Sequence, residues 1–205
     1  MSERIVIVGA GQAGLQTALA LRQEGFDGAL VLLGEEAHAP YQRPPLSKQV
    51  LKGEWPPEKC RLRTPAFLEQ QGIDFRPGTR AIALDTKRRQ LALADDRVID
   101  YDQLAICTGA RLKRLELSGS GLAGIHYLRT LDDAVILREA LKASPHLTVA
   151  GGGYIGLEVA ASARELGCEV DLIEPQPRLM QRSALAPISA WFEERHERAG
   201  VRLHL

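Results

Sequence analysis

The same glycine-rich turn occurs twice in this sequence, each time between an apolar run and a helical pattern. The first copy reads IVIVGAGQAGLQTAL over residues 5–19, and the second reads TVAGGGYIGLEVA over residues 148–160. Both place the pattern G-x-G-x-x-G directly after a predicted strand and at the start of a predicted helix. One such turn has many structural uses, but two in full strand–helix–strand context predict two nucleotide-binding units.

Each glycine of the pattern has a separate physical task. The first makes the tight turn, the second lets a pyrophosphate approach the backbone, and the third lets the helix pack closely on the strand. The free N–H groups at the start of the helix then meet the diphosphate. The six glycines in these roles are Gly9, Gly11, Gly14, Gly151, Gly153 and Gly156.

An acidic residue follows the second strand of each unit, Glu35 in the first and Glu174 in the second. A carboxylate at this position takes the ribose hydroxyls of a dinucleotide. It also repels a 2′-phosphate, so Glu174 favours NADH over NADPH. Two dinucleotides in one chain suggest that electrons pass between them, and a flavin and a nicotinamide are the economical pair because hydride moves from one to the other.

The pattern along the chain predicts an α/β protein with two Rossmann-like nucleotide-binding domains. We expect a first, FAD-binding domain over residues 1–112 and a second, NAD-binding domain over residues 113–205. Prolines exclude long regular elements between residues 37 and 64. Short strands over residues 73–100 predict a small antiparallel insertion, and a buried strand within residues 101–110 is expected to return to the first sheet.

The end of the sequence leads to a further expectation. A last helix, near residues 186–199, is followed by a strand that begins at Val201, and the sequence stops shortly after it. Because parallel strands need neighbours, we expect the second domain to be truncated and the chain to be a piece of a longer polypeptide.

Composition excludes several other classes of function. The 26 basic residues balance 26 acidic ones, so we expect no general affinity for nucleic acid or for acidic membranes. The apolar run Ile5–Val8 is too short for a signal peptide or a membrane span, which favours a cytoplasmic protein. Cys60, Cys107 and Cys168 are too widely spaced for a CxxC site, and the histidines lack metal-ligand spacing, so no metal site is predicted.

Six segments carry a more specific signal: VIVGAGQAG, PYQRPPLSK, LAICTGA, LRTLDDA, GGGYIGLEVAA and IEPQPRLM. Together they resemble the ferredoxin reductase component of bacterial aromatic-ring-hydroxylating dioxygenases. Relatives of this kind include the biphenyl and 3-phenylpropionate dioxygenase reductases, putidaredoxin reductase and rubredoxin reductase. The resemblance implies the glutathione reductase-like flavoprotein fold, with FAD on the first turn and NADH on the second.

The resemblance also implies roles for individual residues. Arg43 and Lys48 of RPPLSK would reach the FAD pyrophosphate and isoalloxazine, Ala81 would contact the adenine side through its backbone, and Arg129 would touch the cofactor. The residues expected at the ADP half of FAD are Gly9, Gly11, Ala13, Gly14 and Glu35. Those expected at NAD are Gly151, Gly153, Ile155, Gly156, Glu158 and Glu174.

Glu158 can be interpreted in two ways. It lies two residues after Gly156, in the predicted first turn of a helix, where a carboxylate is favoured by the helix dipole and can be a structural charge alone. In the similar reductases this glutamate pairs with the lysine of PPLSK. That implies an ion pair between Lys48 and Glu158 which positions the nicotinamide for hydride delivery and is displaced when NADH arrives. Lys48 would also stabilise the anionic reduced flavin.

Residues 34–59 contain no cysteine, unlike the disulfide reductases of this fold. We therefore expect electrons to leave the flavin for an outside one-electron acceptor, and the resemblance favours the [2Fe–2S] ferredoxin of a multicomponent dioxygenase. The expected activity is an FAD-dependent NADH:ferredoxin oxidoreductase. The alternatives are a rubredoxin reductase, a flavin NADH oxidase or a non-catalytic nucleotide-binding flavoprotein. The sequence does not specify the aromatic substrate, the ferredoxin or the oligomeric state.

Overall fold

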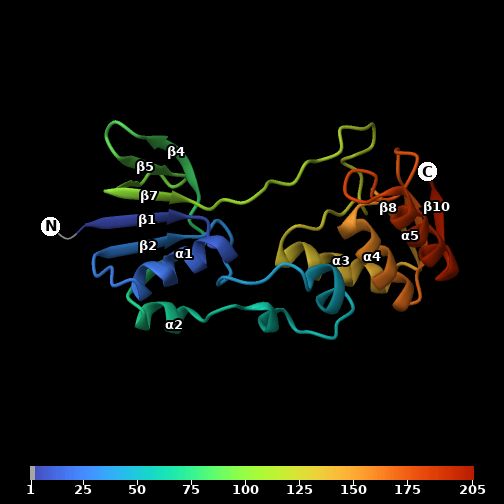
Figure 1. The fold of residues 1–205 in the computed structure, drawn as a ribbon, viewed down its shortest axis with the longest axis horizontal. Helices are drawn as coiled ribbons and strands as arrows, with labels where there is room; N and C mark the ends of the chain where they lie inside the picture. The colour runs from blue at the N-terminus through green and yellow to red at the C-terminus, as the bar shows by residue number, and fades with distance from the viewer. Residues whose placement is uncertain (1–2) are drawn as a thin grey trace. The chain divides into compact units, whose positions relative to one another are not determined.

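In a computed structural model of the chain, described for residues 3–205, the polypeptide forms two compact α/β units (Figure 1). The first unit comprises the chain up to Gln42 together with Cys60–Arg111, and the second comprises Arg43–Lys59 together with Leu112–Leu205. The 43–59 segment therefore lies within the sequence of one unit but packs with the other. The sequence interpretation left this segment within residues 1–112.

The first unit contains a four-stranded parallel sheet in the order β3-β2-β1-β7. Its strands are β1 (Arg4–Val8), β2 (Ala29–Leu33), β3 (Ile73–Arg76) and β7 (Gln103–Ile106). One face packs against α1 (Gln12–Gln23) and α2 (Pro65–Gln70), through a core that includes Ile7, Leu32 and Leu68. Alternate residues of the same strands point to the opposite face, so both faces of this sheet are apolar.

The opposite face of this sheet is covered by a three-stranded antiparallel sheet. Its strands are β4 (Ala81–Asp85), β5 (Gln90–Leu93) and β6 (Val98–Asp100), in the order β4-β5-β6. Val6, Val31 and Leu33 of the parallel sheet pack there against Leu91 and Leu93. Burial on both faces explains why β1 and β2 have continuous apolar sequences.

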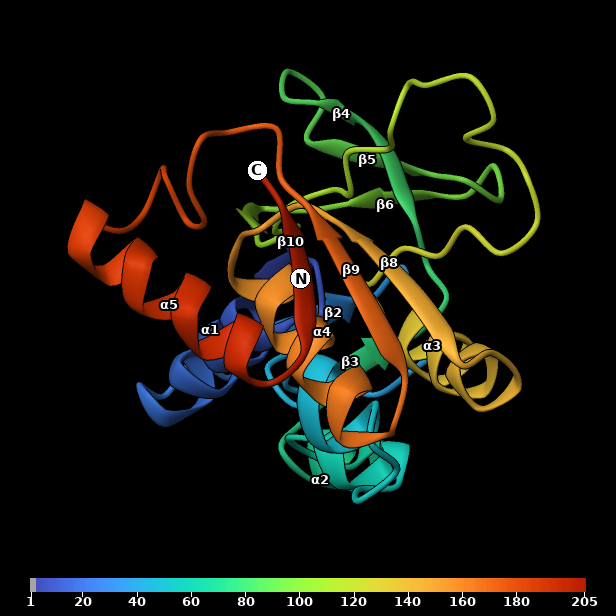
Figure 2. The same ribbon diagram turned by 90° about the vertical axis from the view of Figure 1, so that its right-hand side faces the viewer.

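The second unit contains a three-stranded parallel sheet in the order β10-β9-β8 (Figure 2). Its strands are β8 (His146–Ala150), β9 (Glu169–Ile173) and β10 (Val201–His204), and its α-helices are α3 (Leu131–Ala143), α4 (Tyr154–Glu165) and α5 (Ala186–Arg198). The core joins Val170 and Leu172 of β9 to Leu157 of α4 and Leu137 of α3, and it also contains Leu51. Leu51 is completely buried, so it anchors the 43–59 segment in this unit.

The 43–59 segment leaves and re-enters the first unit at neighbouring points. Tyr41 forms an antiparallel bridge with Arg61, and the Gln42 N–H donates to the Cys60 carbonyl at 2.9 Å. Between these points lies a π-helix, η1 (Leu46–Val50). The 3₁₀-helix η2 (Pro57–Cys60) begins near the end of the 43–59 segment. The prolines at 44, 45, 56 and 57 flank these short helices, which agrees with the predicted lack of long elements.

Two sequence interpretations of the first unit were wrong. The strand near residues 73–75 is not part of the antiparallel insertion, because β3 pairs in parallel with β2 and Leu30 lies opposite Ile73. The insertion is confined to β4, β5 and β6. The second interpretation was that the strand within residues 101–110 is buried. This strand does return to the first sheet, as β7, but it lies at the sheet edge and its Ile106 side chain is 66% exposed.

The two units repeat one design beyond their glycine turns. The order β1, α1, β2, α2, β3 of the first corresponds to β8, α4, β9, α5, β10 of the second, and both sheets place these strands in the same spatial order. An arginine occupies the same place near the end of the helix that follows each glycine turn, Arg22 in α1 and Arg164 in α4.

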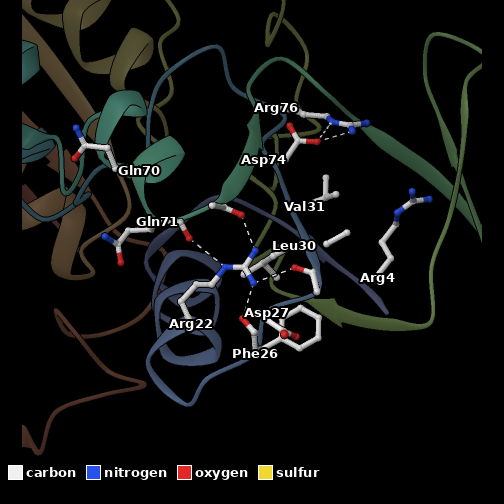
Figure 3. Close-up of a pocket in the computed structure, with 13 residues that line it drawn as sticks. Arg4, Arg22, Phe26, Asp27, Leu30, Val31, Gln70, Gln71, Asp74 and Arg76 are labelled. Atoms are coloured by element: carbon white, nitrogen blue, oxygen red, sulfur yellow. Dashed lines mark hydrogen bonds and ion pairs between the residues drawn. The ribbon is translucent and has the colours of Figure 1, made fainter. Parts of the chain in front are cut away.

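Both arginines donate to backbone carbonyls of two loops. Arg22 donates to Phe26 and Gly28 at 2.6 and 3.0 Å, and to Gln71 and Gly72 at 3.1 and 2.6 Å (Figure 3). These loops follow α1 and precede β3. Arg164 donates in the same way to the carbonyl of Cys168 at 2.6 Å, after α4, and to that of Ala199 at 2.9 Å, before β10. Each arginine therefore ties its helix to the entry of the third strand.

We expect Arg22→Met and Arg164→Met each to lower the free energy of unfolding by about 2 kcal/mol, because several carbonyl oxygens lose a charged donor. Urea denaturation followed by circular dichroism measures the change. Arg182→Met, at an exposed position, is the control and should alter stability by less than about 0.5 kcal/mol. Equal stability of Arg22→Met and the control would contradict the role given to Arg22.

Candidate nucleotide-binding sites

The first glycine turn is enforced by close contacts of the backbone. Gly9 has a φ of +108°, and a Cβ atom on it would lie 2.2 Å from the Cys107 carbonyl oxygen. A Cβ on Gly14 would lie 1.9 Å from the Gly9 carbonyl oxygen, whereas a Cβ on Gly11 would meet nothing within 4 Å. The fold therefore needs glycine at 9 and 14, while Gly11 leaves open space in front of α1.

The second turn has a similar backbone geometry, except that a Cβ on Gly151 would meet nothing within 4 Å. Gly151 has a φ of +111°, and a Cβ on Gly156 would lie 1.9 Å from the Gly151 carbonyl oxygen. A Cβ on Gly153 would again meet nothing within 4 Å. In both turns the first glycine has a positive φ, the third packs closely on the turn backbone, and the second leaves open space.

The helices that follow the turns begin without a side-chain cap. Gly11 is the N-cap of α1 and Gly153 is the N-cap of α4, and neither helix has an acidic residue in its first turn. Backbone N–H groups and the positive end of the helix dipole then remain for an anion at the carboxyl end of the strands. This arrangement fits the diphosphate of FAD in the first unit and that of NADH in the second.

The two predicted ribose-binding carboxylates are held differently. Glu35 follows β2, and its exposed side chain lies 3.5 Å from the Arg80 guanidinium. Glu174 follows β9 and accepts hydrogen bonds from the backbone N–H groups of Gly152, at 2.7 Å, and of Gln176, at 2.9 Å. These bonds fix the Glu174 carboxylate directly beside the second glycine turn.

Lys48 and Glu158 form the ion pair that the sequence interpretation expected. The Lys48 ammonium lies 2.7 Å from Glu158 Oε1, and each side chain is 37% exposed. The Ser47 hydroxyl donates to the other carboxylate oxygen, Oε2, at 2.5 Å. Glu158 is the fifth residue of α4 and not part of its first turn, because the helix begins at Tyr154. The helix N-terminus alone is therefore not what holds this carboxylate.

Three residues on one stripe of α4 hold the 43–59 segment. Beside Glu158, the Ser162 hydroxyl donates to the Ser47 carbonyl at 2.7 Å, and Glu165 lies 2.8 Å from the Lys52 ammonium. The Glu165 carboxylate, with Glu54, raises the pKa of Lys52 above its usual value. Sequence reasoning missed Ser47 and Ser162. The available signal was that Ser162 lies one helical turn after Glu158, on the same face of the helix.

The remaining predicted FAD contacts lie on different elements. The Arg43 guanidinium donates to the Arg129 carbonyl, so these two residues meet within the second unit. Ala81 opens β4 in the first unit, opposite Leu93. Ala13 lies in the first turn of α1, and Ile155 lies in the first turn of α4 with about half of its side chain exposed.

The surface depression of Figure 3 is not a candidate for either nucleotide site. It is lined by Arg4 and Ala29 at the starts of β1 and β2, and by the Arg22 side chain, which is hydrogen-bonded to loop carbonyls. Ligands of open α/β sheets bind at the opposite, carboxyl ends of the strands. Within residues 3–205 there is no cluster of three or more potential metal ligands, and no helix is long and apolar enough to cross a membrane.

Comparison with known proteins decides the family. The sequence profile of the family described as pyridine nucleotide-disulphide oxidoreductase matches residues 3–205. The chain belongs to this family. One relative is the p-cumate 2,3-dioxygenase system ferredoxin–NAD(+) reductase component of Pseudomonas putida. It is 46% identical over 198 residues, which are 97% of this chain and 49% of the relative.

Solved structures show the same fold. The ferredoxin reductase for the CYP199A2 system from Rhodopseudomonas palustris matches with a TM-score of 0.95 and 42% identity, over 98% of this chain and 50% of that one. The covalent putidaredoxin reductase–putidaredoxin complex matches with a TM-score of 0.94 and 40% identity, over 98% of this chain and 49% of that one. The chain thus spans about half the length of these relatives. The predicted fold class and the predicted resemblance are confirmed.

Substitution should distinguish the glycines that the fold requires from those that only leave open space at the turns. We expect Gly14→Ala and Gly156→Ala to lower the free energy of unfolding by about 3 kcal/mol or more, because the added methyl group meets a backbone carbonyl. Gly11→Ala and Gly153→Ala are the matched controls and should cost less than about 1 kcal/mol. Thermal and urea unfolding measure all four. Equal losses at positions 11 and 14 would contradict the geometry.

Proposed function

We propose that this chain carries the FAD and NADH sites of an NADH-dependent ferredoxin reductase that serves an aromatic-ring-hydroxylating dioxygenase. Hydride would pass from NADH to FAD, and single electrons would then go to a [2Fe–2S] ferredoxin. The observation that carries the proposal is the Lys48–Glu158 pair, because it places a cation and an anion at 2.7 Å within reach of the second glycine turn.

In the first unit we assign the open space at Gly11 and the start of α1 to the FAD diphosphate, and Glu35 to its ribose. By resemblance to the family, Ala81 would contact the adenine side of the cofactor, and Arg43 and Arg129 are also assigned to FAD. FAD supplies acceptance of a hydride and release of single electrons.

In the second unit we assign Gly153 and the start of α4 to the NADH diphosphate, and Glu174 to the ribose hydroxyls of the adenosine half. Ile155, half exposed in the first turn of α4, would pack against the dinucleotide. Glu158 would position the nicotinamide end after NADH displaces Lys48. The released ammonium of Lys48 would then favour negative charge nearby.

The names of the relatives support the ferredoxin as the acceptor. The p-cumate system protein is a ferredoxin–NAD(+) reductase component, and putidaredoxin reductase has been captured with putidaredoxin. Within the chain, Cys60, Cys107 and Cys168 are all free, and burial raises the pKa of the Cys60 thiol above its usual value. A buried thiol with a raised pKa is a poor nucleophile, which argues against a thiol relay. We place the protein in the cytoplasm, where NADH is available.

Absorption spectra and acceptor assays test the proposed function. The purified chain, mixed with FAD and freed of excess, should show two flavin bands that bleach on addition of NADH. Reoxidation should be fastest with a [2Fe–2S] ferredoxin, whereas fastest reoxidation by rubredoxin or by oxygen would favour one of the alternative reductases. A chain that binds FAD but does not bleach with NADH would overturn the proposal.

Lys48→Met should slow bleaching by about tenfold or more, because the negative charge that develops when hydride is accepted loses a nearby cation. Lys87→Met, at an exposed turn, is the matched control.

Glu174 should determine the preference between the two nicotinamide dinucleotides. We expect Glu174→Ala to weaken NADH binding by about tenfold, through the loss of hydrogen bonds from the ribose. NADPH binding should change less, because repulsion of its 2′-phosphate is removed at the same time. Calorimetric titration measures both, with the exposed Glu197→Gln as control. A variant that loses affinity equally for both dinucleotides would contradict this role.

A further inference from the structure

We infer that Ser47 is a positioning residue of the second nucleotide site: its hydroxyl holds the Glu158 carboxylate in the orientation that receives the nicotinamide end of NADH. This inference rests on the proposed function, because it concerns how the chain handles that ligand. Ser47 precedes Lys48 in the sequence. Neither the glycine turns nor the composition predicted its contact with Glu158.

The two oxygens of Glu158 have two different partners. Oε1 faces the Lys48 ammonium at 2.7 Å, and Oε2 accepts from the Ser47 hydroxyl at 2.5 Å. Lys48 is a long, flexible cation whose side chain is 37% exposed, so it can move into solvent without leaving an unpaired buried group. Ser47 is only 5% exposed and has a single rotatable bond that carries its hydroxyl. When Lys48 is displaced, Ser47 therefore keeps hold of the carboxylate.

Ser47 is itself held from two directions. Its carbonyl accepts the Ser162 hydroxyl at 2.7 Å, in a buried hydrogen bond to the same helix that carries Glu158. Its neighbours in η1, Leu46 and Val50, are buried at 3% and 0% exposure. The serine hydroxyl thus approaches Glu158 from a rigid position, and the carboxylate loses little further rotational freedom when a ligand binds.

Ser47 and Lys48 are consecutive residues of the π-helix η1, and both reach the same carboxylate. Short π-helical turns occur frequently at functional sites. In this turn Ser47 is buried and Lys48 is partly exposed, which suits a carboxylate that must exchange one partner and keep the other.

Two ligands distinguish positioning from a merely structural role. NADH contains the nicotinamide, whereas ADP-ribose has the same adenosine and diphosphate groups but lacks it. With Ser47→Ala in the full chain, we expect calorimetric titration to show about fivefold weaker binding of NADH, the loss of one net hydrogen bond. Binding of ADP-ribose should change by less than about twofold, since Gly153, Glu174 and the start of α4 are intact. Ser47→Thr keeps the hydroxyl and should restore NADH binding.

A double-mutant cycle shows whether Ser47 acts through Glu158. In the Glu158→Ala background, Ser47→Ala should have no further effect on the ratio of the two affinities. An equal loss of both ligands with a lower melting temperature would make Ser47 structural and overturn the inference. Unchanged NADH binding by Ser47→Ala would overturn it while the proposed function stands. If the wild-type chain bound ADP-ribose but not NADH, both would fail.

Discussion

The closeness of a helix to the strand before it is the constraint on which both units depend. At Gly14 and Gly156 no side chain can fit, because a single added carbon would lie 1.9 Å from the carbonyl of the first glycine in the turn. That contact directs the start of each helix to the carboxyl end of its sheet. At the other end of the same helices, Arg22 and Arg164 bind the loop carbonyls. Each helix is therefore fixed at both ends, and its uncapped N-terminus stays where a diphosphate can reach it.

Local patterns predicted most of the elements, because strand and helix periods and glycine spacing depend on residues close in sequence. They could not predict which strand pairs with which. The short run at Ile73 carries no information on whether it pairs with β2 or with the antiparallel sheet, and the apolar β7 does not reveal that it lies at an edge. The same limit applied to the site. The Lys48–Glu158 pair was expected only through resemblance to a family. The helical spacing of Ser162 from Glu158 places both on one face of the helix, but it does not identify Ser47, 115 residues away, as the partner.

The start of α4 illustrates how a small local difference changes a physical explanation. Placed in the first turn, Glu158 could have been held by the helix dipole alone. Because α4 begins at Tyr154, the carboxylate lies beyond that turn, and side chains of the 43–59 segment hold it instead. The electrostatics of this site consequently depend on a segment that is distant in sequence and anchored by the buried Leu51.

The path of the 43–59 segment has a consequence for how such chains can be recombined. The backbone passes from one unit to the other at Gln42, returns at Cys60 and passes again after Arg111, and the first two passages are joined at their base by the hydrogen bond from Gln42 to Cys60. No single cut in the gene can therefore deliver either unit intact. A chimera with a relative that exchanges only the sequence after Arg111 would combine α4 of one parent with the 43–59 segment of the other. A working exchange must therefore carry both pieces together.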